Sequence, residues 1–223
     1  MSDATSVVWA RGLGLQYGSS PALRDVTVEV GRGEFVAFVG PSGSGKTSLL
    51  LCLCGLLMPD RGEVGFGDTV VSRLAEHDRD RLRRESFGSV FQFGDLVPEL
   101  TVGENVALPL RLQGIHRREA TRRAVEQLDV FGIANLANRR VGEVSGGEMQ
   151  RAAISRALVH GPAVVFADEP TGALDEENRD VVLDELIAAS ARAASAVVLV
   201  THDRDLASRA GRVVTMCAGQ VVA

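Results

Sequence analysis

A glycine-rich stretch between two apolar segments constrains this chain more than any other feature. It reads Gly40-Pro41-Ser42-Gly43-Ser44-Gly45-Lys46-Thr47-Ser48 and follows the pattern G-x-x-x-x-G-K-[ST]. Residues 35–39 before it are an apolar run typical of a buried strand, whereas residues 49–57 after it are too long and too rich in leucine for a second strand. Glycines let backbone N–H groups curl around an anion, and the N-terminus of a following helix adds partial positive charge. The stretch therefore predicts a phosphate-binding loop.

Two side chains of this loop have the expected chemistry. Lys46 can reach the β- and γ-phosphates of a nucleotide, and the Thr47 hydroxyl can bind Mg²⁺. Lys46 is also the only lysine among the 24 basic residues, the others being arginine. Lysine is a compact point charge that fits a tight loop better than the planar fork of arginine does. The alternative interpretation is a flexible loop of glycine and serine without a ligand.

Composition limits the class of protein. The chain has 223 residues, enough for one large domain or one domain with an inserted lobe, and its net charge of −5 offers no overall basic field to nucleic acid. Cys52, Cys54 and Cys217 lack metal-ligand spacing, so we expect three reduced core thiols in an intracellular protein. The longest apolar run, residues 49–58, is too short to span a bilayer, and the polar residues 1–5 do not resemble a secretion signal.

The order of the apolar segments predicts the fold. Short strand patterns at residues 7–9, 13–17 and 23–30, followed by a hairpin around Gly67-Asp68, indicate an N-terminal antiparallel β subdomain. Further on, buried-strand runs at residues 163–168 and 196–200 alternate with helical segments. Between these parts, the section from residue 93 to about 140 is helical in pattern. We therefore predict an α/β fold with a mainly parallel sheet, an N-terminal antiparallel β subdomain and an inserted α-helical subdomain.

Polar residues follow the ends of the expected parallel strands. Lys46, Gln92, Asp168 and His202 lie at or just past such ends, where α/β sheets bind ligands. Phosphoryl transfer needs a carboxylate that holds Mg²⁺ and a group that orients or deprotonates the attacking water. Asp168 suits the first role and Glu169 the second. The alternative is that the two carboxylates only cap the turn that follows the strand.

The segment Ser145-Gly146-Gly147-Glu148 has two interpretations, which can both hold. Ser145 and Glu148 have the spacing of a capping box that starts a helix. Paired glycines are unfavourable in a helix, each costing up to ~1 kcal/mol relative to alanine in a helix interior. They make sense where a ligand approaches the backbone closely, and a helix N-terminus with free N–H groups is a natural anion site.

The order of these motifs resembles the ATP-binding cassette of ABC transporters. The match covers essentially the whole chain and consists of residues 40–48, Gln92, residues 144–150, residues 164–170, Gly172-Ala173-Leu174-Asp175 and His202. It implies a P-loop NTPase core within one cassette domain, residues 1–223. Residues 1–92 and 158–223 would form the α/β core with the antiparallel β subdomain, and residues 93–157 the helical subdomain with the signature motif. Glu148-Met149-Gln150-Arg151 and residues 105–110 resemble the macrolide-exporter and lipoprotein-releasing subgroup.

The resemblance implies a role for several residues at the nucleotide. Tyr17 is similar to the aromatic residue that stacks on adenine, although a tyrosine at a strand edge can also be structural. Gln92 is similar to the glutamine that senses Mg²⁺ and the attacking water, and it leads into a segment, residues 92–100, that would face the membrane subunit. The implied Mg²⁺ ligands are Thr47, Gln92 and Asp168. The implied catalytic residues are Glu169, His202, Gln92 and Lys46, with His202 contacting the γ-phosphate.

The resemblance also implies a composite site. Ser145 and Gly147, together with Gly146 and Glu148, would contact the γ-phosphate bound by the other protomer, and Asp175 would lie at the dimer seam. Two residues depart from the family pattern, because Val144 replaces the commoner leucine and Glu148 the commoner glutamine. The named subgroup often has glutamate there, so only fine tuning is put in doubt.

The implied function is an ATPase with ATP and Mg²⁺ as cofactors. It would dimerise around two Mg²⁺-ATP, as a homodimer or with a similar ATPase, and power an integral membrane permease from the cytoplasmic side of the membrane, without a nucleic-acid partner. The permease would be an exporter or a lipoprotein- or peptide-extruding system, whereas transmission of force or a signal to a cell-envelope complex is the alternative. A chromosome or DNA-repair ATPase is disfavoured because the chain lacks a long coiled-coil insertion. A GTPase is disfavoured because [NT]-K-x-D needs a second lysine.

Overall fold

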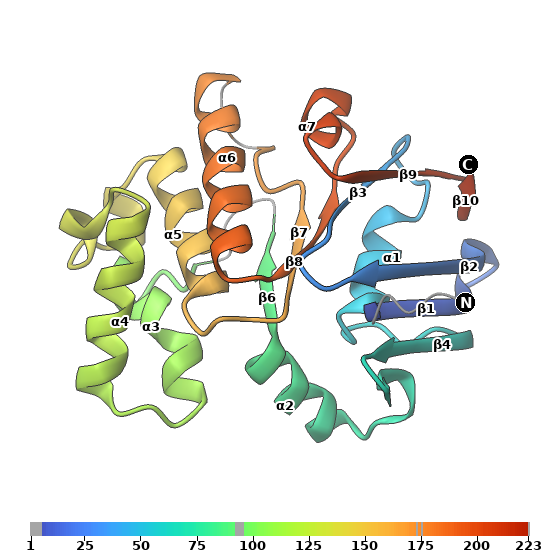
Figure 1. Cartoon of the computed structure of the whole chain (residues 1–223), viewed down its shortest axis with the longest axis horizontal. Coiled ribbons are helices and arrows are strands. Elements are labelled where there is room, and N and C mark those ends of the chain that lie inside the picture. Colours follow the sequence, from blue (N-terminus) through green and yellow to red (C-terminus); the bar gives the residue numbers. More distant parts are fainter. Residues whose placement is uncertain (1–5, 92–95, 173, 175, 223) are drawn as a thin grey trace.

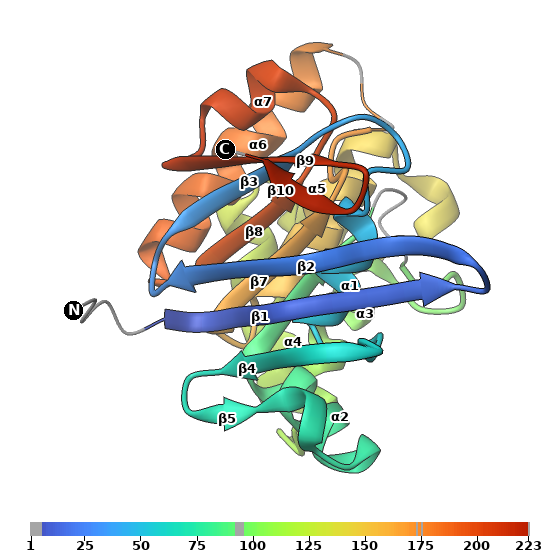
Figure 2. The ribbon, with the colours of Figure 1, turned by 90° about the vertical axis from the view of Figure 1, so that its right-hand side faces the viewer.

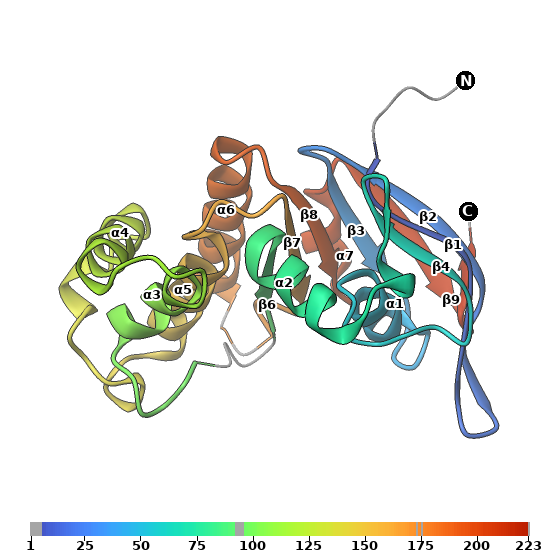
Figure 3. The ribbon, with the colours of Figure 1, turned by 90° about the horizontal axis from the view of Figure 1, so that it is seen from below.

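The computed structural model describes residues 6–91, 96–172, 174 and 176–222, apart from the side chains of residues 176–178. Within these residues, an antiparallel sheet of order β2-β1-β4-β5 packs beside a six-stranded sheet of order β10-β9-β3-β8-β7-β6 (Figures 1 and 2). Helices cover both faces of the larger sheet, and α3 (Val102–Leu112), α4 (Arg117–Val130) and α5 (Gly146–Leu158) gather at the end of the molecule farthest from the antiparallel sheet (Figure 3). The predicted α/β fold class is confirmed.

The antiparallel sheet is built from long amphipathic strands. Its members are β1 (Ser6–Tyr17), β2 (Ser20–Gly31), β4 (Arg61–Phe66) and β5 (Thr69–Val70). The prediction of two separate strands before residue 18 is wrong, because β1 is continuous. Its register on β2 shifts between Ala10 and Leu13, at Gly12 with φ 60°, and this bulge interrupts the alternation of apolar residues.

The larger sheet is mainly parallel, as predicted. Its parallel strands are β3 (Phe35–Val39), β6 (Phe87–Val90), β7 (Val164–Asp168), β8 (Ala196–Val200) and β9 (Arg212–Cys217), and β10 (Gln220–Val222) pairs antiparallel with β9. Strand β3 lies between β8 and β9. The carboxyl ends of these parallel strands therefore meet at one edge, where the site residues were expected.

Alternate residues of the parallel strands enter two different cores. On one face, Val36 and Phe38 pack with α1 (Lys46–Leu53) and the antiparallel sheet. On the other face, Ala37 and Val39 belong to a core shared with α3 (Val102–Leu112), α4 (Arg117–Val130), α5 (Gly146–Leu158), α6 (Glu176–Arg192) and α7 (Arg204–Ser208). The second core runs without a break from the sheet to α3, α4 and α5, so the subdomain boundaries near residues 92 and 158 stay a prediction.

The remaining helices are short or polar. Helix α2 (Glu76–Ser86) has no buried residue, and three single turns of 3₁₀ helix occupy Val71–Arg73, Ala134–Leu136 and Val141–Glu143. Cys52 and Cys54 are buried, which raises their thiol pKa values to about 12 and about 11. The prediction of three core thiols is wrong for Cys217, which is exposed. On β9, Val214 and Met216 take the buried face, so alternation turns Cys217 outward.

Candidate functional site

The phosphate-binding motif forms the loop between β3 and α1, and two of its glycines are required by close approach. A Cβ on Gly40 would lie 2.2 Å from the backbone oxygen of Met216, and one on Gly45 would lie 2.4 Å from that of Ala22. Gly45 also has φ 97°, in the left-handed region that favours glycine. The loop is thus pressed against β9 and β2, and larger residues at these positions would displace it.

Lys46 is the first residue of α1, and its side chain turns back over the loop. Nζ donates hydrogen bonds to the carbonyl oxygens of Gly40 at 2.8 Å and Pro41 at 3.0 Å, and the residue is 8% exposed. Helix α1 has no side-chain N-cap and no acidic residue in its first turn. The free N–H groups and the ammonium group therefore provide positive charge for an anion at this loop.

A pocket of about 550 Å³ brings the loop together with residues from three other parts of the chain. Ser42, Gly43, Gly45, Lys46, Thr47 and Ser48 line it together with Tyr17, Ser20, Pro21, Ala22, Asp168, Glu169, Val200 and His202. Ser44 is buried, whereas Gly40 and Pro41 line an adjoining pocket that His202 shares. Tyr17 is exposed at the pocket, a position compatible with the predicted contact to a base. Sequence reasoning missed Ser20, Pro21, Ala22 and Val200, which the fold alone brings to this pocket.

Asp168 ends β7 opposite the loop. The Thr47 hydroxyl donates to Asp168 Oδ1 at 3.4 Å. Burial raises the pKa of Asp168 and the charge of Glu169 adds to this, while the Thr47 hydrogen bond and Lys46 oppose it. A hydroxyl and a carboxylate are hard oxygen donors, and Mg²⁺ is usually held by one or two protein ligands plus substrate phosphates. The pair therefore fits Mg²⁺, and the described residues contain no cluster of three or more metal-binding side chains that would suggest another metal.

Glu169 is held by contacts from the end of β8. Its Oε1 accepts hydrogen bonds from the His202 backbone N–H at 2.9 Å and lies 2.6 Å from His202 Nδ1, and its Oε2 accepts from the Thr201 hydroxyl at 3.1 Å. The backbone of Glu169 has φ 45°, a strained conformation for a residue with a side chain. His202 itself is exposed to the pocket. Strain and converging donors place this carboxylate in one position beside the phosphate loop.

The segment of residues 145–148 does not line this pocket. The Ser145 backbone N–H and hydroxyl donate to Glu148 Oε2 at 2.7 and 2.9 Å, and the Glu148 N–H donates to Ser145 Oγ at 3.3 Å. The first of these bonds does most to lower the pKa of Glu148. The predicted capping box is confirmed, and Gly146 beside it is exposed. The anion contact expected here stays a prediction, and Gln92 and Asp175 lie outside the described residues.

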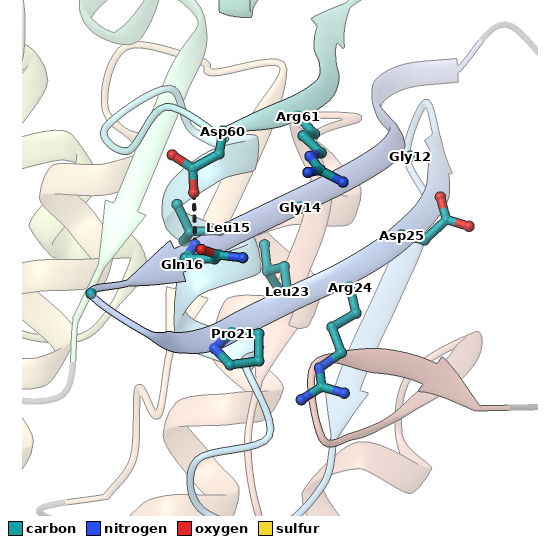
Figure 4. Close-up of a pocket in the computed structure, with 11 residues that line it drawn as sticks. Gly12, Gly14, Leu15, Gln16, Pro21, Leu23, Arg24, Asp25, Asp60 and Arg61 are labelled. Carbon is teal, nitrogen blue, oxygen red and sulfur yellow. Dashed lines mark hydrogen bonds between the residues drawn. The ribbon is translucent and has the colours of Figure 1, made fainter.

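A larger pocket of about 640 Å³ lies along β1 and β2 (Figure 4). Its lining has none of the predicted site residues, and Arg24 and Arg61 are balanced there by Asp25 and Asp60. Asp60 is already engaged, because its Oδ2 accepts from the Gln16 N–H at 2.7 Å. The smaller pocket is therefore the better candidate. It combines positive charge for a phosphate, from Lys46 and the start of α1, with the Thr47 and Asp168 oxygens that fit Mg²⁺.

Comparison with known proteins decides the family. The model of the ABC transporter family matches residues 23–172. The chain belongs to the ABC transporter family. A lipoprotein-releasing system ATP-binding protein LolD from Bacteroides thetaiotaomicron is 41% identical over 94% of this chain and 96% of its own length. LolD from Paramagnetospirillum magneticum is 45% identical over 90% and 88%. The dimeric ATP-binding cassette MJ0796 in a post-hydrolysis state, bound to ADP and Pi, matches with a TM-score of 0.87 and 33% identity over 97% of both chains.

These relatives confirm the family that the motifs resemble. As an ABC ATP-binding subunit, the chain is a nucleotide-binding cassette of a family whose members bind ATP, and membership implies ATPase activity. Among the residues that the structure describes, no helix is both long and apolar enough to cross a bilayer.

Proposed function

We propose that this ABC subunit hydrolyses ATP as a dimer around two Mg²⁺-ATP and powers a membrane permease from the cytoplasmic side. One observation carries the proposal: the pocket unites the phosphate loop with Tyr17, Asp168, Glu169 and His202, while the capped start of α5 does not line it. A second copy of the chain would complete the site by bringing its own residues 145–148 to this pocket. The dimeric state of the related cassette MJ0796 supports the proposal of a dimer.

Each part of the pocket then has a role in binding. The Lys46 ammonium and the N–H groups at the start of α1 hold the β- and γ-phosphates, and Tyr17 stacks on adenine. Thr47 and Asp168 hold Mg²⁺, with Gln92 as the further ligand that we propose outside the described residues. When bound, Mg²⁺ would neutralise charge on the phosphate oxygens. Glu169 is the carboxylate that orients or deprotonates the attacking water, while His202 contacts the γ-phosphate.

The partner surface that we propose differs from the segment expected at residues 92–100. Residues 92–95 lie outside the described residues, and Leu96 is 7% exposed and packs in the core. Val97 is held by Asn105, whose Oδ1 accepts from the Val97 N–H at 2.7 Å. The buried Leu96 side chain offers no exposed anchor to a partner, although Val97 is half-buried and Pro98 and Glu99 are exposed.

A neighbouring pocket of about 290 Å³ has the exposed apolar surface that docking requires. It lies between α2, β6, α3 and the end of α5, and its lining residue Leu112 is 56% exposed. Apolar side chains line it together with three arginines and a histidine, namely Phe87, Leu108, Pro109, Leu112, Arg83, Arg84, Arg156 and His160. We propose that a cytoplasmic permease segment with an apolar anchor and acidic neighbours binds here. The LolD relatives favour an exporter or a lipoprotein- or peptide-extruding permease.

The proposed dimer is tested with a variant that binds ATP without turning it over. Glu169→Gln keeps the shape of the side chain but removes its negative charge, so turnover should fall by about 10²-fold or more while ATP is retained. Light scattering should then show a dimer with ATP and Mg²⁺ and a monomer without them. Glu76→Gln, on the exposed start of α2, is the matched control and should keep normal turnover. A Glu169→Gln protein that stays monomeric with saturating ATP, or that keeps normal turnover, contradicts the proposal.

A further inference from the structure

Asp203 is the junction of three separate hydrogen-bonding systems. Its Oδ1 accepts from the N–H groups of Asp205 at 2.8 Å and Leu206 at 3.2 Å and so caps α7. Its own N–H donates to the Thr201 hydroxyl at 3.1 Å, and that hydroxyl donates to Glu169 Oε2. His202 stands between Thr201 and Asp203 in the sequence. The position of Asp203 therefore sets the positions of both His202 and the groups that hold Glu169.

The third system is an ion pair with α6. Arg179 Nη1 donates to Asp203 Oδ2 at 2.7 Å, and the two side chains are only 24% and 21% exposed. A charge-assisted bond of this length in a half-buried place is stronger than a surface ion pair, and removing one partner leaves the other charge poorly solvated. Arg179 lies in the first turns of α6, the helix that follows the segment 172–175 after β7.

We propose that Arg179 is a positioning residue for ATP hydrolysis, which acts through Asp203 to hold His202 and Glu169 in their reactive arrangement. This inference rests on the proposed roles of Glu169 and His202. The described contacts of Arg179 are with Asp203 and Asp180 and not with the phosphate loop, so its loss leaves that loop in place. Turnover, not ATP binding, is the quantity that depends on the pair.

The chain offers a matched control in a second ion pair between the same two regions. Arg209, just past α7, donates to Asp184 Oδ1 of α6 at 2.5 Å and lies 3.7 Å from Asp180 Oδ1. This pair joins α6 to α7 as the first does, and among the described contacts it shares Asp180 Oδ1 with Arg179, at 3.9 Å from Arg179 Nε, but has no bond to Asp203. Arg209→Gln therefore reports the cost of losing a contact between these helices without the link to His202.

The test compares Arg179→Gln, Arg179→Lys and Arg209→Gln in the full chain. We expect kcat for ATP to fall on the order of tenfold in Arg179→Gln, the scale seen when a group that orients a functional residue is lost. KM should stay within about twofold, because ground-state binding is untouched. Arg179→Lys should recover part of kcat, and Arg209→Gln should match the wild type. Equal kcat in the two Gln variants, a rise in KM without a fall in kcat, or no recovery with lysine overturns the inference.

Hydrogen exchange separates this inference from the proposed function. Amides of residues 201–206 should exchange faster in Arg179→Gln than in Arg209→Gln, whether or not the protein hydrolyses ATP. If the wild type lacks activity, or Glu169→Gln keeps it, the proposed function fails, while the exchange rates still decide whether Arg179 holds residues 201–206 in place. If Arg179→Gln does not fold, Asp203→Asn provides the same comparison, because it keeps an oxygen for the α7 cap and removes the charge.

Discussion

Thr47 and Asp168 are 121 residues apart in the chain, yet the Thr47 hydroxyl lies 3.4 Å from Asp168 Oδ1. One residue follows β3 and the other ends β7, and β8 lies between these two strands. The meeting of the two oxygens at the edge of the sheet is the structural basis of the proposed Mg²⁺ site. The ionisation of Asp168 therefore affects both the proposed Mg²⁺ binding and the stability of the fold.

Asp168→Asn should stabilise the protein without nucleotide and remove its response to Mg²⁺-ATP. Because burial raises the pKa of Asp168, its ionised form costs stability above the ordinary pKa of 3.8. The variant should therefore melt at a higher temperature than the wild type at neutral pH, and this gain should shrink as the pH falls toward 3.8. At a nucleotide concentration of about 100 times Kd, the wild type should gain about 2.7 kcal/mol, and the variant should lose the Mg²⁺-dependent part.

Scanning fluorimetry with and without Mg²⁺-ATP measures both effects of Asp168→Asn. Asp129→Asn, on the exposed face of α4, is the control and should follow the wild type. An Asp168→Asn protein with the wild-type Mg²⁺ response would place the metal elsewhere.

Lys46→Ala should weaken ATP binding by more than tenfold, since it removes a nearly buried charge from the phosphate site. Lys46→Arg should recover little, because the loop carbonyls that Nζ contacts leave room for a compact cation and not for a planar fork. Titration with a fluorescent ATP analogue measures the affinity. Arg61→Ala, in the larger pocket along β1, should bind as the wild type does. Equal affinities in the Lys46 and Arg61 variants would move the phosphate site away from this loop.

How much the sequence predicted depended on whether a feature was local. Strands β3 and β8 were expected at residues 35–39 and 196–200, where the structure has them, because continuous apolar runs bounded by polar residues mark buried strands. Helix α7 was missed, since five residues are too few to show a helical period, although Asp203 is a recognisable N-cap. The bulge at Gly12 was taken for a break between two strands, because it interrupts the alternation of apolar residues.

The site shows the same limit. Residues of the phosphate loop and the strand ends could be named from motifs, because each motif holds its chemistry in a few adjacent positions. The contacts of Arg179 with Asp203 and of Thr201 with Glu169 join elements that meet only in the folded chain. Their residue types are common on protein surfaces, so no local pattern marks them. The burial of Leu96 was missed because it depends on how α3 packs above the segment.

Ser145→Ala should lower both stability and turnover, whereas a matched cap on another helix should lower stability only. Thr101 and Glu104 form a capping box at the start of α3 with the same bonds that Ser145 and Glu148 make at α5. Ser145→Ala and Thr101→Ala should each lose about 1 kcal/mol of unfolding free energy, the usual contribution of a helix cap. Only Ser145→Ala should also lose ATP turnover, because only Ser145 is proposed to reach the nucleotide of a second protomer. Urea titration and phosphate release measure the two effects, and equal turnover in both variants argues against the composite site.

Leu112→Asp combined with Arg84→Glu should release the chain from its membrane partner without harming its ATPase site. The pocket between α2 and α3 is lined by apolar side chains and arginines, so a carboxylate in place of Leu112 repels an acidic partner segment and removes a contact for its apolar anchor. Leu112 is already 56% exposed, so the change leaves the core intact, in contrast to any change of the buried Leu96. Sedimentation with membranes of the native cell should fall at least tenfold, while binding of a fluorescent ATP analogue stays unchanged.

Val130→Asp, at a similarly exposed valine of α4, is the control and should still sediment. Membrane association that survives in the double variant, or is lost as readily in Val130→Asp, would show that the permease docks on another surface.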